Sequence, residues 1–371
     1  METMLDYIRQ TPSVLLNIID NHKEYTEKLI DFYKENGYDR IHFVASGSSY
    51  NGTLCALYFM KDILQTEIGL STPFTFENHE DCRKDTLYIF VSQSGCSTNI
   101  LSAISKLKNQ GYKCACLVGR DDSDAEKIAD VTLNWKVGEE KIGFVTKGVS
   151  SLACFLMCFS LRLAEEQNFV DEKTYHYYLD EMRKTQKIQP QLLDNTIKVF
   201  EDNKNDFLGL KKVILLSSGP NIGTITEGAL KISETCCISG QAFEAEEFLH
   251  GPIYPSTPED LFIIVDNNDH PSSERMIAIA NALKDISDKV YVLSNDSTFD
   301  ETHRFSTDLQ SDPLVSPLYK LTCLQVLAYL ITENTNRYEP HEKIKLFKKA
   351  NKVASKSRAN LYLDLQKIEK I

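Results

Sequence analysis

Three charged side chains in the second half of the chain have the spacing of one face of a helix. Glu227, Lys231 and Glu234 fall within an arc of about 60° at the helical rotation of about 100° per residue. An apolar stripe on the opposite face predicts a helix that rests on a core and consists of Ile225, Ala229, Ile232 and Cys236. The charged face would then turn toward solvent or a cleft. Two carboxylates beside an amine can transfer protons, although a Glu and a Lys four residues apart also form ordinary surface pairs worth about 0.2–0.5 kcal/mol.

A histidine in a sharp turn follows this predicted helix. In Leu249-His250-Gly251-Pro252 the glycine and proline force the backbone to turn and can hold the imidazole at a fixed angle. The whole stretch resembles the isomerase domain of glucosamine-6-phosphate synthase and the wider sugar-isomerase (SIS) family of phosphosugar enzymes. That family carries E-G-A-L-K-x-x-E followed at this spacing by H-G-P, and the same letters stand here at Glu227, Gly228, Ala229, Leu230, Lys231, Glu234, His250, Gly251 and Pro252.

The resemblance implies catalytic roles for the charged residues of this stretch. Glu234, with Glu227 in the same set, would move a proton between C1 and C2 of an open-chain phosphosugar through an enediol or enolamine. Lys231 would either form an imine with the C2 carbonyl or stabilise its oxyanion, and His250 would open the sugar ring by protonating its oxygen. The reaction would be an aldose–ketose isomerisation.

Two hydroxyl-rich loops in the first half of the chain each follow a short apolar strand and precede a helix. The strands are expected at 40–44 and 87–91, and the loops at 45–51 and 92–99. Backbone N–H groups and hydroxyls at the start of a helix suit a phosphate, although each loop taken singly can also be a plain serine-rich turn. The pair resembles the G-T-S and S-Q-S-G-x-T loops of the SIS family, which implies that the substrate is bound by Ser46, Gly47, Ser48, Ser49, Ser92, Gln93, Ser94 and Ser97.

A third loop ends in Thr146-Lys147 and matches a T-K pair that the family places in a binding loop. The chain also departs from the family's letters. Ser48 stands where threonine is usual, Cys96 where glutamate is usual, and Ser97 where threonine is common. A hydroxyl group therefore remains at each of these positions except 96.

The order of strands, loops and helices repeats along the chain. Three apolar runs of the second half repeat three of the first at offsets of 172, 174 and 176 residues; they are 212–216, 261–265 and 289–293 against 40–44, 87–91 and 113–118. Strands that alternate with helices in this way predict an α/β protein with two doubly wound parallel sheets, each flanked by helices. With the resemblance, these become two tandem SIS domains followed by a C-terminal arm.

We expect two domains and an arm with separate tasks. The predicted limits are 1–188 for a helical arm plus the first SIS domain, 189–345 for the second SIS domain, and 346–371 for the C-terminal arm. The resemblance implies that the arm contributes a lysine, for which Lys352 is the nearest match and Lys356 a competitor. Where the first half has its S-Q-S-G loop, the second has Asp-Asn-Asn-Asp, whose carboxylates would repel a phosphate. We therefore expect phosphate binding in the first half and acid/base chemistry in the second.

Two helical segments lie between the repeats. Residues 152–163 form an apolar run that is too short to span a bilayer and contains Arg162, which predicts a buried helix. Residues 164–211 have a polar helical pattern and are expected to bridge the domains, with a break at Gln189-Pro190-Gln191.

Composition narrows the class of protein. The 371 residues, of which 42% are hydrophobic and 25% charged, are typical of a soluble globular protein with two domains. A net charge of −12 argues against nucleic acid and anionic membrane as partners. The ten cysteines form no regular framework and indicate buried free thiols in a reducing compartment, which points to the cytoplasm. No signal peptide, metal cluster or nucleotide motif is visible, and no cofactor is expected.

Several activities fit these features. Glucosamine-6-phosphate synthase begins with a glutaminase domain whose nucleophile is an N-terminal cysteine, and a chain that begins Met-Glu-Thr-Met leaves no room for that domain. We therefore expect a fructosamine-6-phosphate deglycase or an amino-sugar-phosphate deaminase/isomerase. The resemblance implies a homodimer with shared active sites. The alternatives are a sugar-phosphate-binding regulator without turnover, which would not need the residues at 227, 231, 234 and 250 together, and the isomerase subunit of a synthase-like aminotransferase.

Overall fold

The computed structural model describes residues 2–268, 272–335, 344 and 355. The chain divides into two compact units. Unit 1 is built mainly from residues 13–179, and unit 2 from residues 3–12 and the described residues of 180–335. We propose that the domains end where the sequence predicts, at 188/189 and 345/346.

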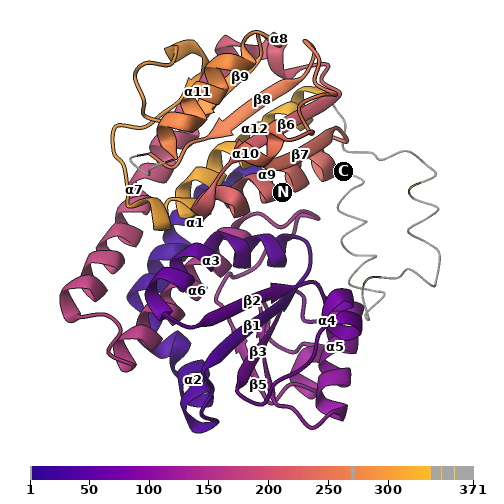
Figure 1. Cartoon of the computed structure of the whole chain (residues 1–371), viewed down its shortest axis with the longest axis vertical. Coiled ribbons are helices and arrows are strands. Elements are labelled where there is room, and N and C mark those ends of the chain that lie inside the picture. Colours follow the sequence, from indigo (N-terminus) through magenta and orange to yellow (C-terminus); the bar gives the residue numbers. More distant parts are fainter. Residues whose placement is uncertain (1, 269–271, 336–343, 345–354, 356–371) are drawn as a thin grey trace. The chain divides into compact units, whose positions relative to one another are not determined.

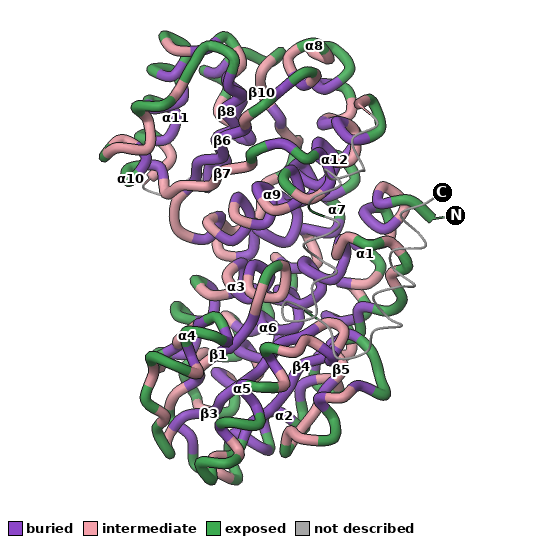
Figure 2. The backbone as a smooth tube through the Cα atoms, turned by 90° about the vertical axis from the view of Figure 1, so that its right-hand side faces the viewer, coloured by how far each residue is buried: buried purple, intermediate pink, exposed green. Residues whose placement is uncertain are grey.

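Unit 1 is a five-stranded parallel sheet flanked by helices (Figure 1). Its strands lie in the order β2-β1-β3-β4-β5. Their bounds are β1 Arg40–Ala45, β2 Glu67–Ser71, β3 Thr86–Ser92, β4 Cys114–Val118 and β5 Val131–Asn134. Every residue of β3 and β4 is buried, as expected of near-continuous apolar strands between helix layers (Figure 2). The order changes direction between β1 and β3, and doubly wound sheets bind ligands beside the carboxyl ends of the strands at such a point.

Helices α4 and α5 pack on one face of this sheet, where Phe76 and Ile104 contact Val44 and Phe90 in a common core. Because crossovers between parallel strands are right-handed, α3, which connects β1 to β2, lies on the other face. The helical segments are α2 His22–Glu35, α3 Ser48–Leu64, α4 Pro73–His79, α5 Thr98–Asn109, the 3-10 turn η1 Asp124–Lys127 and α6 Lys147–Glu166, while α1 Met4–Asp20 contributes to both units.

Helix α6 is the core helix of unit 1. By length and composition it could cross a membrane, yet 89% of its most apolar window is buried inside the protein. It packs so closely against α3 that a Cβ on Gly52 would lie 3.1 Å from the Leu152 side chain. The prediction of a buried helix at 152–163 is confirmed.

Unit 2 repeats the topology of unit 1. Its parallel strands lie in the order β10-β9-β8-β6-β7, so β6 takes the place of β1 and β8 that of β3. Their bounds are β6 Lys212–Ser217, β7 Ser239–Glu244, β8 Leu261–Val265, β9 Val290–Leu293 and β10 Arg304–Phe305. The predicted duplication of one α/β unit is confirmed.

The helices of unit 2 form a core on each face of the sheet. Helices α7, α9 and α12 pack on one face, and α10 and α11 pack on the other. The segments are α7 Glu172–Asp202, α8 Lys204–Phe207, η2 Gly219–Asn221, α9 Ile222–Thr235, α10 Ala245–Leu249, α11 Ser273–Leu283, η3 Glu301–His303, η4 Pro313–Val315 and α12 Pro317–Thr335.

The predicted break at residues 189–191 is wrong, because α7 continues through Pro190. A proline inside a helix costs about 3 kcal/mol. Here it lies between Ile188 and Leu192, which are both fully buried in the core of unit 2, and the Gln189 side chain donates to the carbonyl of Ile8 (2.9 Å). Tertiary packing therefore outweighs the local preference for a break.

Candidate active site

The loops after β1 and β3 meet at the carboxyl ends of these neighbouring strands. Asn99, at the start of α5, donates a hydrogen bond from Nδ2 to Oγ of Ser46 in the first loop (2.9 Å). Helix α3 begins at Ser48, directly after Gly47, whose φ of +55° is a left-handed conformation that favours glycine. The N-termini of two helices are thus brought together, and this arrangement favours an anion.

The loop between β3 and α5 is held in shape by its own hydrogen bonds. Ser92 Oγ donates to Ser97 Oγ (3.1 Å), and Ser94 Oγ accepts from the backbone N–H of Cys96 (3.2 Å). Gly95 has a φ of +60°, and a Cβ there would lie 2.2 Å from a neighbouring side chain, so glycine is required. The Cys96 side chain is fully buried and brings no carboxylate to the position where the family usually has glutamate.

Glu140 was missed by the sequence analysis and joins two of the predicted binding loops. Its Oε2 accepts a hydrogen bond from Nε2 of Gln93 (2.6 Å), and its Oε1 accepts from the backbone N–H groups of Thr146 (3.0 Å) and Lys147 (2.7 Å). Burial raises the pKa of Glu140, although these three hydrogen bonds and the charge of Lys147 act in the opposite direction. A single glutamate in a polar loop belongs to no periodic pattern. The only signal in the sequence was its position shortly before the N-terminus of a helix.

The C-terminal segment contributes one described contact to this region. The backbone N–H of Thr98, the first residue of α5, donates to the carbonyl of Ser355 (3.1 Å), and both residues belong to unit 1. The predicted lysines of the arm, Lys352 and Lys356, lie outside the described residues.

The Glu/Lys/Glu group of unit 2 is formed on α9 and is largely buried. Lys231 Nζ lies 3.0 Å from Oε1 of Glu227 and also contacts the carboxylate of Glu234. The side chains of Lys231 and Glu227 have no exposed surface, while that of Glu234 is 32% exposed. The expectation of a charged face open to solvent or a cleft therefore holds only for Glu234. The three residues form one compact ion cluster rather than a surface pair.

Lys231 is held in its charged form by its two partners. Burial by itself would lower the pKa of Lys231, but the charges and hydrogen bonds of Glu227 and Glu234 outweigh burial and leave that pKa raised. An imine requires a neutral amine, whereas stabilising an oxyanion requires an ammonium. Of the two roles left open by the sequence, an amine that lies between two carboxylates fits the second.

Residues around this cluster serve packing. The predicted apolar face of α9 is confirmed, since Ile225, Ile232 and Cys236 are buried. A Cβ on Gly228 would lie 2.4 Å from Leu324 of α12, so the glycine of the E-G-A-L-K motif permits close approach of two helices.

His250 ends the short helix α10 and is exposed. The turn continues through Gly251 with a φ of +147°. Within the described parts of the chain, no hydrogen bond or ion pair connects the His250 side chain with Glu227, Lys231 or Glu234. Strand β7, which the sequence analysis did not identify, lies between α9 and α10 along the chain.

In unit 2, described side chains just after β6 and β8 form hydrogen bonds with one another. Asn221 Nδ2 donates to Oδ1 of Asn267 (2.7 Å), so the residues that follow β6 and β8 are joined by two side-chain amides. The carboxylate of Asp266 accepts from Ser294 (2.6 Å), and the buried Lys320 donates to the Asp266 carbonyl. Burial lowers the pKa of Lys320 to about 8 against the attraction of Asp266. Phosphate binding in the first unit rather than the second stays a prediction.

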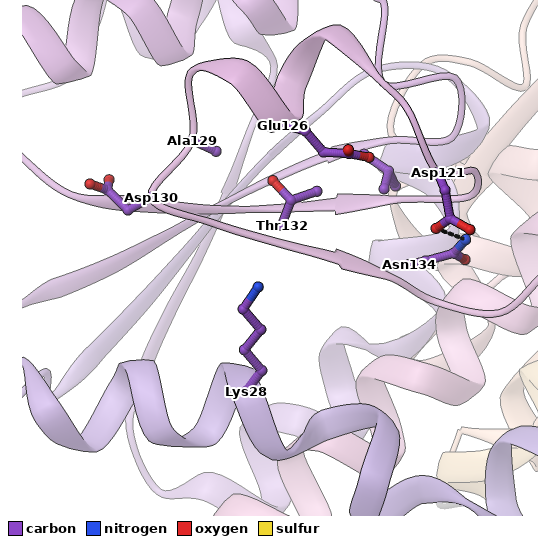
Figure 3. A pocket seen from close by; sticks show the side chains of 8 residues that line it. Lys28, Asp121, Glu126, Ala129, Asp130, Thr132 and Asn134 are labelled. Atoms are coloured by element: carbon purple, nitrogen blue, oxygen red, sulfur yellow. Dashed lines mark hydrogen bonds between the residues drawn. The ribbon is translucent and has the colours of Figure 1, made fainter.

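A separate pocket of about 320 Å³ lies in unit 1 (Figure 3). Lys28 of α2 lines one side, and Asp121, Glu126 and Asp130 line the other. Asp121 accepts a hydrogen bond from Asn134 (2.9 Å), and Asp130 accepts from a backbone N–H (2.8 Å). None of the predicted site residues lines this pocket, and its carboxylates would repel a phosphate. Across the described residues, no group of three or more His, Cys, Asp or Glu side chains is arranged to hold a metal ion.

Comparison with known sequences connects these features with one family. Residues 32–161, from the end of α2 into α6, match the model of the SIS domain. A glutamine–fructose-6-phosphate aminotransferase (isomerizing) from Thermococcus kodakarensis is 26% identical over 341 residues, which make up 88% of this chain and 54% of that protein. The chain thus spans about half the length of this relative.

Solved structures share the fold over both units. A Clostridium difficile protein assigned to the phosphosugar isomerases aligns with a TM-score of 0.85 and 22% identity, over 96% of this chain and 99% of that one. Glucosamine-6-phosphate deaminase from Thermotoga maritima aligns with a TM-score of 0.69 and 18% identity, over 90% and 98%. The chain therefore is an α/β protein that contains a SIS domain. Its two units together share the fold of these solved structures.

Proposed function

We propose that this protein transfers a proton between C1 and C2 of an amino-sugar or fructosamine 6-phosphate and releases the amine. The buried cluster of Glu227, Lys231 and Glu234 carries this proposal, because a protein that only senses sugar phosphates has no need of it. The SIS domain, a relative named for fructose 6-phosphate and a structural neighbour named as a glucosamine-6-phosphate deaminase support the substrate class.

Each group has one task in the proposed reaction. The loops that contain Ser46 and Ser92 hold the phosphate at the starts of α3 and α5. Glu234, the carboxylate with exposed surface, takes a proton from C1 of the open-chain fructosamine to give an enolamine and returns it to C2. The positive charge of Lys231 stabilises the C2 oxygen in this step, and Glu227 keeps that charge in place. The resulting C1 imine then adds water, which releases the amine and leaves a hexose 6-phosphate.

Mass spectrometry of the purified protein with phosphorylated fructosamines and hexosamines tests the proposed function. We expect release of an amine and a hexose 6-phosphate from at least one C1-linked fructosamine 6-phosphate. Formation of glucosamine 6-phosphate from fructose 6-phosphate and glutamine would show a synthase-like activity instead. Tight binding of sugar phosphates without any turnover would show a regulator. Either result would contradict the proposal.

The hydroxyls of the loop after β3 are expected to recognise the phosphate. Replacing Ser92 and Ser94 together by alanine should raise KM for the phosphorylated substrate about tenfold or more, because hydrogen bonds to a charged group are lost. Activity on the unphosphorylated sugar should stay the same. Steady-state kinetics on both substrates checks this, with Ser105→Ala on the exposed part of α5 as the control. A crystal soaked with a sugar phosphate that places the phosphate beside Asn267 would rule this assignment out.

We further propose a homodimer in which the exposed His250 completes the site of the partner subunit. Mixing inactive Glu234→Gln with inactive His250→Ala protein should then restore part of the activity, since some mixed sites receive both native groups. Native mass spectrometry verifies that subunits have exchanged. Exchange without any rescue would mean that each chain builds its own site.

The cysteines support a reducing compartment, for which we propose the cytoplasm. All ten lie in the described residues and none forms a disulfide, and only Cys237 is exposed. Buried thiols behave as small apolar side chains and need no oxidising environment.

A further inference from the structure

The carboxylate of Glu140 is the common partner of two chain segments in unit 1. It joins Gln93 in the loop after β3 to the backbone of Thr146 and Lys147 at the start of α6. In all three hydrogen bonds the carboxylate is the acceptor. The ionised acid therefore accepts from two backbone N–H groups at the N-terminus of α6, where the helix offers them no carbonyl partner of its own. One side chain thus connects the predicted phosphate loop to the core helix of the unit.

The Gln93 side chain has little freedom to leave this carboxylate. A Cβ on Gly148 would lie 2.3 Å from Oε1 of Gln93, and a Cβ on Gly119 would lie 2.7 Å from its Cγ. The Gln93 carbonyl also accepts from the backbone N–H of Gly119 (3.0 Å). Two glycines therefore form a slot for the side chain, and the Glu140 carboxylate accepts from the amide at its end.

We propose that Glu140 is a positioning residue that fixes Gln93, and with it the loop of residues 92–98, in the conformation that binds the substrate's phosphate. This role rests on the proposed function of that loop. Glu140 holds the loop through Gln93 and does not itself need to touch the substrate. Its effect should therefore appear in the affinity for the phosphate group.

The substitution Glu140→Gln tests the role with little change in shape. Its carbonyl can still accept from Thr146 and Lys147, but its NH₂ group then faces the NH₂ group of Gln93. We expect the Kd for fructose 6-phosphate, measured by calorimetry, to rise about tenfold, which is about 1.4 kcal/mol. The weak binding of unphosphorylated fructose should not change. Glu139→Gln, at the exposed neighbour, is the matched control and should bind like the wild type.

A rescue variant separates positioning from a general loss of structure. Combining Glu140→Gln with Gln93→Glu reverses donor and acceptor and restores the bond between the two side chains. We expect the double variant to recover part of the affinity for fructose 6-phosphate, because the restored bond fixes the loop while a carboxylate at position 93 opposes the phosphate. Gln93→Met removes the bond from the other side and leaves the hydrogen bonds from the Thr146 and Lys147 N–H groups to Glu140 intact, so it should weaken phosphate binding even if Glu140→Gln does not fold.

The outcomes distinguish this inference from the proposed function. Wild-type affinity in both Glu140→Gln and Gln93→Met would overturn the positioning role while the proposed function stands. Equal weakening for the phosphorylated and unphosphorylated sugars, without rescue in the double variant, would also overturn it. A wild-type protein that binds no sugar phosphate would refute the proposed function, and the positioning role would fail with it.

Discussion

Replacing Glu234 by glutamine is expected to lower turnover at least about a hundredfold, about 2.7 kcal/mol, while the affinity for the substrate stays near that of the wild type. Glu234 is the member of the ion cluster that keeps exposed surface, at 32%, and it contacts Lys231. The amide keeps the shape of the side chain but cannot accept and return a proton. Lys231 keeps Glu227 as its counter-ion at 3.0 Å, so the cluster should survive.

Single-turnover kinetics and calorimetric binding on the same preparation measure the two effects separately. Glu259→Gln, an exposed glutamate in a loop of unit 2, serves as the matched control and should have wild-type kinetics. Turnover within a few-fold of the wild type for Glu234→Gln would end the assignment of Glu234 as the proton-transferring group.

Replacing Lys231 by methionine is expected to abolish activity and to destabilise unit 2 by roughly 3–5 kcal/mol. The substitution leaves the carboxylate of Glu227 buried with no exposed surface and without its counter-ion. Removing the counter-ion of a buried charge costs far more than losing a surface ion pair. A loss of stability of this size would show that the cluster is buried, as it is in the structure.

Urea unfolding followed by two probes locates this loss. The single tryptophan, Trp135, lies in unit 1, where its indole N–H donates to Ser151 of α6 (3.2 Å). Its fluorescence therefore reports on unit 1, while circular dichroism follows both units. We expect an early transition by circular dichroism. The double variant Glu227→Met with Lys231→Met should recover much of the stability but none of the activity. A single variant within about 1 kcal/mol of the wild type would contradict a buried cluster.

The central strands could be predicted because their local sequence and their tertiary environment agree. Leu261–Val265 was predicted with its observed bounds, and the strands around 40–44 and 87–91 within one or two residues. Every residue of β3 and β8 is buried, so these two strands read as near-continuous apolar runs, whereas β1 is marked by its buried Ile41, Phe43 and Val44. The edge strands β2, β7 and β10 were not predicted. Every residue of β7 is partly or fully exposed, so no apolar run marks it.

The sequence by itself determined the duplicated α/β fold, the two hydroxyl loops and the charged face of α9, because each depends on residues close together in the chain. Only the tertiary structure decided that Lys231 and Glu227 are buried, since burial depends on how α9 and α12 approach at Gly228. It also decided that the Glu140 carboxylate accepts a hydrogen bond from Gln93, which lies 47 residues earlier in the chain. No local pattern records such a contact, because its geometry depends on how β3 and α6 are placed in the folded unit.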